Sequence, residues 1–162
     1  MSNDASMPII AAGTGFDAEL TATVKEAIWA FLATAGGRQP HVRVVHPVWE
    51  RRAVWIATRS SSAKVRQLER NRRAELFYWT KDGKHLTVTG PCTIVADPPE
   101  KARVWTLFKD DPIAGYDMGM IWKGAGDPNL ALLRLDPLRI EAFNAPELAQ
   151  GIKPRLWREQ PA

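Results

Sequence analysis

Residues 54–90 read VWIATRSSSAKVRQLERNRRAELFYWTKDGKHLTVTG, and this stretch predicts more of the fold than any other part of the chain. Its beginning, through Thr58, and the segments 74–80 and 84–96, the second of which starts within it, are rich in β-branched and aromatic residues, which predicts strands. Residues 62–71 contain good helix formers preceded by serines, which predicts a short capped helix. Asp82-Gly83 is a typical tight turn, so residues 74–95 should form an antiparallel hairpin.

On the N-terminal side, large apolar residues recur at helical spacing from Asp17 to Ala35, and Gly36-Gly37 follow as a stop signal. This pattern predicts one amphipathic helix. The next two segments, HVRVVHPVW (41–49) and AVWIAT (53–58), are separated by the charged residues 50–52 and predict a hairpin.

On the C-terminal side, Pro91 should bend its strand or place it at a sheet edge. The capping-box spacing of Asp97-Pro98-Pro99-Glu100 predicts a helix that runs through Lys109. Residues 113–129 show no period and predict a loop with at most one helical turn. The segments 130–136 and 139–143 predict two closing strands. Five to seven short strands with helices between hairpins favour an antiparallel barrel of the α+β class.

The length of 162 residues predicts a single domain, and one cysteine excludes an intrachain disulfide or a cysteine cluster for zinc. A lone cysteine favours a reducing, cytoplasmic location. The longest apolar run, 27–33, is far shorter than the roughly 20 residues that span a bilayer, so no membrane helix is predicted. Residues 1–15 lack a basic start and are interpreted as a flexible leader, followed by a domain over 16–150 and a tail over 151–162.

Positive charge is concentrated at one place. The formal net charge is +4, yet residues 59–73 alone sum to +5. A helix N-terminus offers backbone N–H groups and a positive dipole end, which favour phosphate. Thr58, Ser61, Ser62 and Lys64 add hydroxyl and ammonium donors there. The segment predicts either a phosphate site or, alternatively, a solvated helix whose serines only cap it.

The segment from Pro40 to Gly90 resembles the FMN-binding split barrel of the pyridoxamine 5′-phosphate oxidase superfamily, in particular its general-stress-protein-like branch. The resemblance rests on PHVRVV, on VWIATRSSSAKVRQLERNRRAELFYW and on KHLTVTG. It implies a Greek-key split antiparallel barrel with flanking helices. It also implies FMN as the cofactor, or alternatively the deazaflavin F420.

Carried over residue by residue, the resemblance implies that Arg43, Val44 and Val45 lie along the flavin ring. Thr58, Ser62 and Lys64 would hold the phosphate, with Ser61 as a neighbouring hydroxyl. His85 stands where the family often has Gln and would place an imidazole beside the pyrimidine side of the flavin, where negative charge grows on reduction. Trp122 is a candidate to cover the flavin or the substrate.

Three other residues are expected to have no chemical role. His41 and His46 are five positions apart in a predicted strand, so they should point to opposite faces and bind no metal. Each is expected to be a partly exposed strand residue. Cys92 has no paired thiol or neighbouring cation in sequence, and should be a small packed side chain.

The resulting prediction is a homodimeric FMN-dependent oxidoreductase in which the flavin lies between two subunits, carries out the chemistry and reacts with a small-molecule substrate or electron donor. Vitamin B6 oxidation is not expected, because Ala63 replaces a basic residue and only 155–158 resembles the substrate-binding section of that group. One alternative is a non-catalytic flavin-binding stress protein with the same site. Another is nucleic-acid binding through residues 59–73, which lack a recognition helix or a stacking platform.

Overall fold

The computed structural model describes residues 16–110 and 117–159. The helices are α1 (Phe16–Ala27), α2 (Ala63–Arg70), α3 (Pro98–Lys109), the 3₁₀ turn η1 (Met118–Met120) and α4 (Ala145–Ala149). The strands are β1 (Ala30–Thr34), β2 (His41–Val45), β3 (Pro47–Glu50), β4 (Ala53–Arg59), β5 (Arg73–Trp79), β6 (Lys84–Ile94), β7 (Leu130–Leu135), β8 (Arg139–Asn144) and β9 (Arg155–Arg158).

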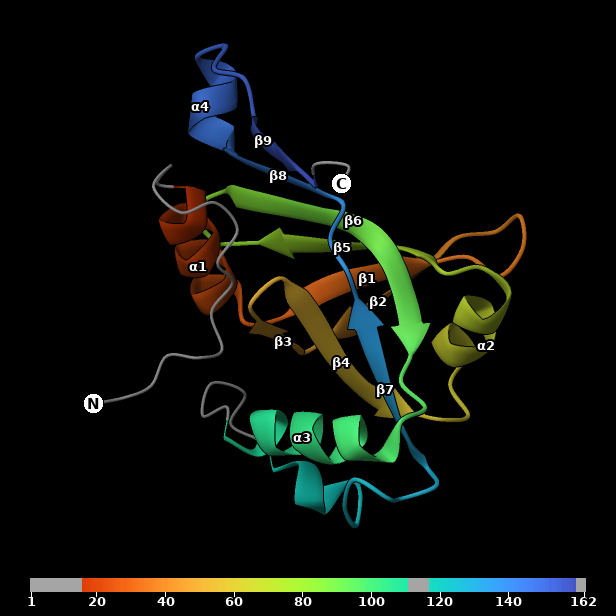
Figure 1. Ribbon diagram of the computed structural model, residues 1–162. Helices are drawn as coiled ribbons and strands as arrows, with labels where there is room; N and C mark the ends of the chain where they lie inside the picture. Colours follow the sequence, from red (N-terminus) through yellow and green to blue (C-terminus); the bar gives the residue numbers. More distant parts are fainter. Residues whose placement is uncertain (1–15, 111–116, 160–162) are drawn as a thin grey trace.

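The nine strands form one curled sheet in the order β2-β1-β5-β6-β7-β4-β3, and β8 pairs with both β6 and β9. All pairings are antiparallel. Helix α3 lies at the ends of β4 and β7, whereas α4 and β9 project from the opposite end of the molecule (Figure 1). The expected split antiparallel barrel with flanking helices is confirmed.

Strand β6 changes partners near its C-terminal end. Residues 85–91 pair with β5, and residues 92–94 pair with β7, so one strand belongs to both halves of the barrel (Figure 1). The change occurs at Gly90 and Pro91, and the expected bend is found there. A Cβ atom on Gly90 would lie 2.0 Å from the Asp136 carbonyl oxygen. Only glycine permits the two segments to approach this closely.

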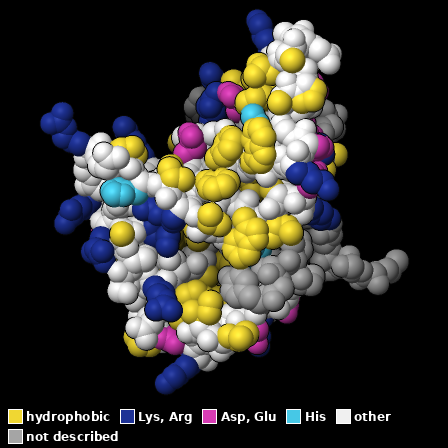
Figure 2. Space-filling model, turned by 180° about the vertical axis from the view of Figure 1, so that it is seen from behind, with side chains coloured by type: hydrophobic (Ala, Val, Ile, Leu, Met, Phe, Trp, Pro, Cys, Tyr) yellow, Lys and Arg dark blue, Asp and Glu magenta, His cyan; other side chains and the backbone are white. Residues whose placement is uncertain are grey.

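The outer face of β1, β2 and β5 exposes several large hydrophobic side chains. They are Phe31, Val42, Val44 and Trp79, and Trp29 precedes β1. Phe31 faces Val44 on one side and Phe77 on the other in the strand register. From behind, hydrophobic side chains form a band on this face of the molecule (Figure 2). We call Phe31, Val42, Val44, Phe77 and Trp79 the outer band.

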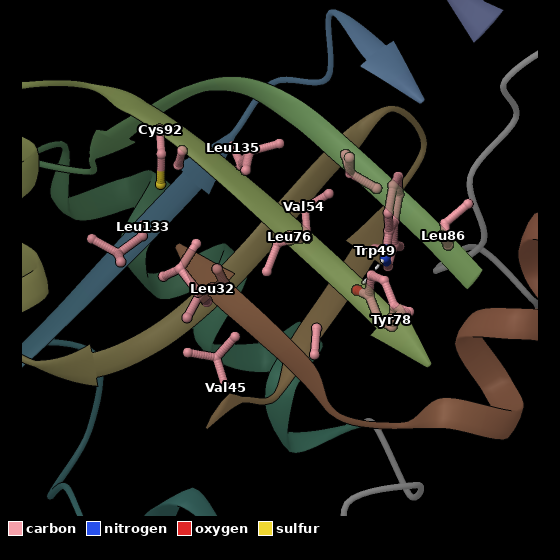
Figure 3. Packing of buried hydrophobic residues seen from close by; sticks show 14 of the residues in the cluster. Leu32, Val45, Trp49, Val54, Leu76, Tyr78, Leu86, Cys92, Leu133 and Leu135 are labelled. Carbon is pink, nitrogen blue, oxygen red and sulfur yellow. Dashed lines mark hydrogen bonds between the residues drawn. The ribbon is translucent and has the colours of Figure 1, made fainter. Parts of the chain in front are cut away.

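The core has two parts. The first fills the barrel interior, where the indole Nε1 of Trp49 donates a 2.9 Å hydrogen bond to the Tyr78 hydroxyl (Figure 3). The second lies between α3 and the β3-β4-β7 half and contains Trp55, Phe108 and Trp122. Cys92 belongs to the first part, and burial raises the pKa of its thiol to about 12. Its expected role as a packed side chain is confirmed.

The helix predicted over 17–35 is wrong in its second half. Helix α1 ends at Ala27, Ile28 has a positive φ of 62°, and residues 30–34 form β1. A β-branched residue in the left-handed region ends the helix. The short apolar run after it fits a strand as well as a helix, and pairing with β2 and β5 selects the strand.

The predicted hairpin over 41–58 is only partly correct. Residues 47–50 pair with β4 as expected, but residues 41–45 pair back with β1. The chain changes partners at His46, between two strands. The hairpin of β5 and β6 is confirmed, with Gly83 at a φ of 84° in its turn. Helices α2 and α3, η1 and the strands β7 and β8 also lie where the sequence predicts them.

The ends of the chain differ from the expectation in two details. Strand β9 lies within the segment expected to be a tail and pairs with β8, and α4 was not predicted. Arg155 of β9 forms ion pairs with Glu19 of α1 and Glu147 of α4, which attach this end to the domain. The expected leader, 1–15, lies outside the described residues. In the part of the chain that the structure describes, no helix is long and apolar enough to cross a bilayer.

Candidate functional site

A cavity of about 690 Å³ opens where β2, β4, the start of α2 and the segment 117–122 meet. Its volume is within the range of small-molecule and cofactor sites, which is roughly 300–1,000 Å³. Its lining residues are Trp29, Val44, Val45, His46, Ala57, Thr58, Arg59, Ser62, Lys64, Asp117, Met120, Ile121 and Trp122. The cavity has a polar end and an aromatic end.

Thr58, Ser62 and Lys64 form the polar end, together with Arg59. Thr58 is at the end of β4, and Ser62 is the N-cap residue of α2, one position before the helix begins. The Lys64 ammonium donates a 2.8 Å hydrogen bond to the Thr58 hydroxyl. The backbone N–H groups of the first helical turn have no acceptor within α2. These groups together can bind an anion such as a phosphate.

The Ser62 hydroxyl is a buried polar group at this end of the cavity. Ser62 makes no side-chain cap, and its Oγ is buried without a hydrogen-bond partner among the described residues. Buried hydroxyl groups in proteins are nearly always hydrogen-bonded, because an unsatisfied one costs free energy. A phosphate oxygen in the cavity would satisfy this hydroxyl. Capping alone, the alternative considered from sequence, does not explain its position.

Electrostatics at Lys64 also favour an anion. Burial lowers the pKa of the Lys64 ammonium below its usual value, and the nearby Arg43 guanidinium lowers it further. Both effects disfavour the positive charge. A phosphate in the cavity would oppose them by direct attraction. Of the six basic residues in 59–73, Arg59 and Lys64 line the cavity.

Trp29, His46 and Trp122 form most of the aromatic end. Ala30 pairs with Val45, so the residues just outside that pair, Trp29 and His46, come together with ring centroids 5.4 Å apart. The Phe108 ring of α3 lies 6.4 Å from the His46 ring. His46 is therefore buried between two aromatic rings, with 8% of its surface exposed.

One backbone carbonyl connects the two ends of the cavity. The Asn129 oxygen accepts a hydrogen bond from the Ser60 amide at 2.8 Å and another from the Trp122 indole at 3.2 Å. The Ser60 hydroxyl also donates to the Pro128 oxygen. The turn before α2 and the segment that contains Trp122 are thus fixed to the same loop. Their relative position sets the shape of the cavity.

Six of the residues predicted from sequence line this cavity: Val44, Val45, Thr58, Ser62, Lys64 and Trp122. Arg43 and Ser61 do not line it. The Arg43 guanidinium donates to Thr34 Oγ1 and, at 2.9 Å, to Gln67 Oε1. Ser61 is exposed, and its carbonyl accepts from Arg66.

His85 lies away from the cavity of its own chain. It stands on β6, where its ring centroid is 4.2 Å from that of Trp79 and 4.3 Å from that of Phe143. Burial lowers the pKa of its imidazole, which favours the neutral form. Phe77 also contacts it, at 5.6 Å. His85 is therefore next to the outer band and not next to Lys64.

Sequence reasoning missed Trp29, His46 and Asp117. The expectation that His46 is a partly exposed strand residue is wrong, because it is buried and lines the cavity. Pairing of β1 with β2 places it there, and the helix predicted over 17–35 hid that pairing. In the described ranges 16–110 and 117–159, no three His, Cys, Asp or Glu side chains gather in a way that could hold a metal ion.

Comparison with known families gives one match that covers most of the chain. Residues 16–144 match the family described as pyridoxamine 5′-phosphate oxidase. Among curated proteins, no match is found.

Several solved structures share the fold. General stress protein 26 from Bacillus anthracis superimposes with a TM-score of 0.68 at 20% identity, over 90% of this chain and 100% of that one. A NimC/NimA family protein from Clostridium acetobutylicum has a TM-score of 0.68 at 18% identity, over 84% and 87%. A pyridoxamine 5′-phosphate oxidase-related, FMN-binding protein from Nostoc punctiforme has a TM-score of 0.63 at 17% identity, over 93% and 100%.

Proposed function

This chain belongs to the pyridoxamine 5′-phosphate oxidase family, and on that premise we propose that it binds FMN in the cavity and acts as an oxidoreductase on a small molecule. The observation that carries the proposal is the buried, unpartnered Ser62 hydroxyl beside the Lys64–Thr58 pair. One structural relative is described as FMN-binding. A phosphate monoester fits the donors that the cavity offers.

In this proposal the phosphate is held by Thr58, Ser62 and Lys64, and the ring lies along Val44 and Val45. The backbone of β2 offers the ring hydrogen-bonding groups, while the apolar side chains exclude water. When bound, the flavin supplies electron transfer to or from the substrate. The residues of this chain position the cofactor and shape access to it, so no side chain needs to act as an acid or base.

We further propose that the protein is a homodimer whose interface borders the cofactor. Val44 belongs to the outer band and also lines the cavity, with 57% of its surface exposed. A second copy that covers the outer band (Figure 2) would therefore border the cavity. Exposed aromatic side chains are common in the centres of such interfaces.

The proposed dimer also changes the role expected for His85. Because His85 lies next to the outer band of its own chain, the imidazole predicted beside the flavin would come from a second copy. We expect His85→Gln to change the reduction potential of bound FMN, measured by spectroelectrochemistry. Phe31→Glu should produce monomers in sedimentation velocity and abolish that sensitivity. A potential unchanged by His85→Gln in an intact dimer would rule out the role of His85.

FMN binding is tested by titrating the purified apoprotein with FMN and following flavin fluorescence. We expect Lys64→Ala to weaken binding about 30-fold, because charge-assisted hydrogen bonds are worth about 2 kcal/mol. Lys81→Ala is the control, since Lys81 is exposed and does not line the cavity. Equal effects of the two variants would refute the phosphate site.

Two further measurements distinguish FMN from F420 as the cofactor, and an enzyme from a non-catalytic flavin-binding protein. A parallel titration with the deazaflavin F420 shows which flavin is preferred. Reduction of the FMN-loaded protein by NADH or NADPH, followed at 450 nm, tests turnover. A protein that binds FMN tightly but is reduced by neither nicotinamide would instead match the non-catalytic flavin-binding alternative.

A further inference from the structure

We propose that a second cavity, formed where the β3-β4 turn, α3 and the end of β7 meet, binds a small organic carboxylate through arginine side chains and the indole N–H of Trp55. This cavity has a volume of about 830 Å³. It shares no lining residue with the cavity assigned to FMN. The inference therefore goes beyond the proposed function and does not depend on it.

Trp55 provides a buried polar group at this second cavity. Its side chain lines the cavity, although only 1% of its surface is exposed. Among the described residues, its indole Nε1 has no hydrogen-bond partner. A buried N–H group without an acceptor costs free energy, so such groups are nearly always paired in proteins. An acceptor oxygen of a bound ligand would satisfy this N–H group.

Two guanidinium groups lie over the Trp55 ring. The Cζ atoms of Arg103 on α3 and Arg134 on β7 are 5.5 Å and 5.4 Å from the ring centroid. Both side chains are partly exposed, at 44% and 45%. Exposed side chains change rotamer rapidly, so these two can move to admit a ligand oxygen to the indole. The same oxygen would then also meet positive charge.

Hydrogen-bond donors are in excess around the second cavity. Each guanidinium nitrogen of Arg103 donates to Glu50 or Glu100. Arg134 uses only its Nε in this way, which donates to Asp136 at 2.8 Å. Its two terminal nitrogens make no hydrogen bond to any residue that the structure describes. Because a guanidinium offers donors and no acceptor, these groups suit a ligand that only accepts, such as a carboxylate.

The charge of the lining indicates a ligand with a single negative charge. Four arginines and three carboxylates line the cavity, so its net charge is +1. The arginines are Arg51, Arg52, Arg103 and Arg134. Within residues 16–110 and 117–159, Arg51 forms no ion pair, and Arg52 pairs only with Glu159 at 3.5 Å. One carboxylate balances this charge, whereas a phosphate monoester, at about −1.5 to −2, exceeds it.

The backbone of the β3-β4 turn does not explain the arginine at position 51. Arg51 is the first of the two residues that connect Glu50 to Ala53, and its φ is 55°. Glycine adopts this left-handed conformation without the steric cost that a side chain adds. An arginine therefore makes the turn less stable than glycine would. At the cavity, its guanidinium can pair with a ligand carboxylate.

The experiment uses benzoate and its neutral isostere benzamide as probes. Each is titrated into isotope-labelled full-length protein, with and without saturating FMN, and binding is followed by heteronuclear NMR. The seven tryptophans give indole N–H signals, and Trp55→Phe identifies the signal of Trp55. Circular dichroism checks that each variant is folded.

We expect benzoate to move the Trp55 indole proton signal downfield along a saturable curve. Benzamide should bind about fivefold more weakly, because it lacks the charge that pairs with arginine. Trp55→Phe should weaken benzoate binding about fivefold, the effect of one hydrogen bond. Saturating FMN should leave benzoate affinity unchanged, since the two cavities share no lining residue.

Arg51→Gly separates ligand binding from stability. It should weaken benzoate binding about fivefold, because it removes an exposed ion-pair partner. It should also raise the midpoint of thermal unfolding by roughly 2–4 °C, because glycine suits the turn. Arg73→Ala is the control, since Arg73 is exposed on β5 and lines neither cavity. It should match the wild type in benzoate affinity.

Several results would overturn the inference. They are the absence of saturable benzoate binding, equal affinity for benzoate and benzamide, a Trp55 signal that does not move at saturation, or unchanged benzoate affinity in Arg51→Gly. Loss of benzoate binding in the presence of FMN would also overturn it, because the probe would then occupy the FMN cavity. If the wild type binds no FMN, the proposed function fails, and the titrations of the apoprotein still decide this inference.

Discussion

The two ends of the cavity are built in different ways. The polar end comes from residues 58–64, which are contiguous in sequence and connect β4 to α2. The aromatic end is assembled from three separate segments, at Trp29, His46 and 117–122. Trp122 is also part of the second core cluster. Thr58, Ser62 and Lys64 of the polar end belong to neither core cluster, whereas Trp122 of the aromatic end also stabilises the fold.

Replacing Trp122 should destabilise the protein more than any other substitution considered. Its indole is 5% exposed and donates a hydrogen bond to the Asn129 carbonyl. Trp122→Ala should lower the free energy of unfolding by about 3–5 kcal/mol, because it leaves a cavity in the core. Chemical denaturation of the apoprotein measures this. The neighbouring Ile121→Ala, at a half-exposed position, should cost no more than about 1 kcal/mol. Similar losses of unfolding free energy in both variants would contradict the role of Trp122 in the core.

The second effect is a pH dependence at the polar end. Burial and Arg43 lower the pKa of Lys64 below 10.5. FMN binding favours the ammonium form, so affinity should be full below this lowered pKa and fall by roughly tenfold as pH rises through it. In the apoprotein the sign is reversed, since a lowered lysine pKa makes folding more favourable as pH rises toward 10.5.

Lys64→Arg provides the control for this pH dependence, because a guanidinium stays charged across the range. Isothermal calorimetry of FMN binding from pH 7 to pH 10 should show the decline in the wild type only. If FMN affinity declined equally in both proteins, the titrating group would not be Lys64, and its assigned role in holding the phosphate would be wrong.

The smallest effect distinguishes two adjacent serines. Ser62→Ala should weaken FMN binding about fivefold and leave apoprotein stability unchanged or slightly higher, since its buried hydroxyl has no partner there. Ser61 is exposed and outside the cavity lining. Ser61→Ala should therefore change neither quantity measurably. Equal losses of FMN affinity in the two variants would mean that both hydroxyls reach the phosphate.

The same contrast explains what the sequence could predict. Thr58, Ser62 and Lys64 lie within seven residues, so a local strand-to-helix pattern was enough to place them together. The hairpin of β5 and β6 was predictable for the same reason, because Asp82-Gly83 specifies its turn. Residues close together in the sequence therefore specify both the polar end of the cavity and the β5–β6 hairpin.

Trp29 and His46 could not be placed in this way. They meet only because β1 pairs with β2, and the apolar run at 30–34 also fits a helix. The positive φ of Ile28, which separates α1 from β1, leaves no signal in residue type, since isoleucine is uncommon there. His85 shows a second limit. Its position within one chain does not place it at the cavity, and only the proposed dimer would bring it there.

The continuity of strand β6 also couples the unfolding of the two halves of the barrel. Since β6 pairs with β5 and β8 along one part and with β7 along the next, opening of one half of the barrel should disturb the other half. Amide protons in both halves should exchange with solvent through the same global event. A ligand held at the start of α2 would then slow exchange as far away as β8, with no change in the structure of β8.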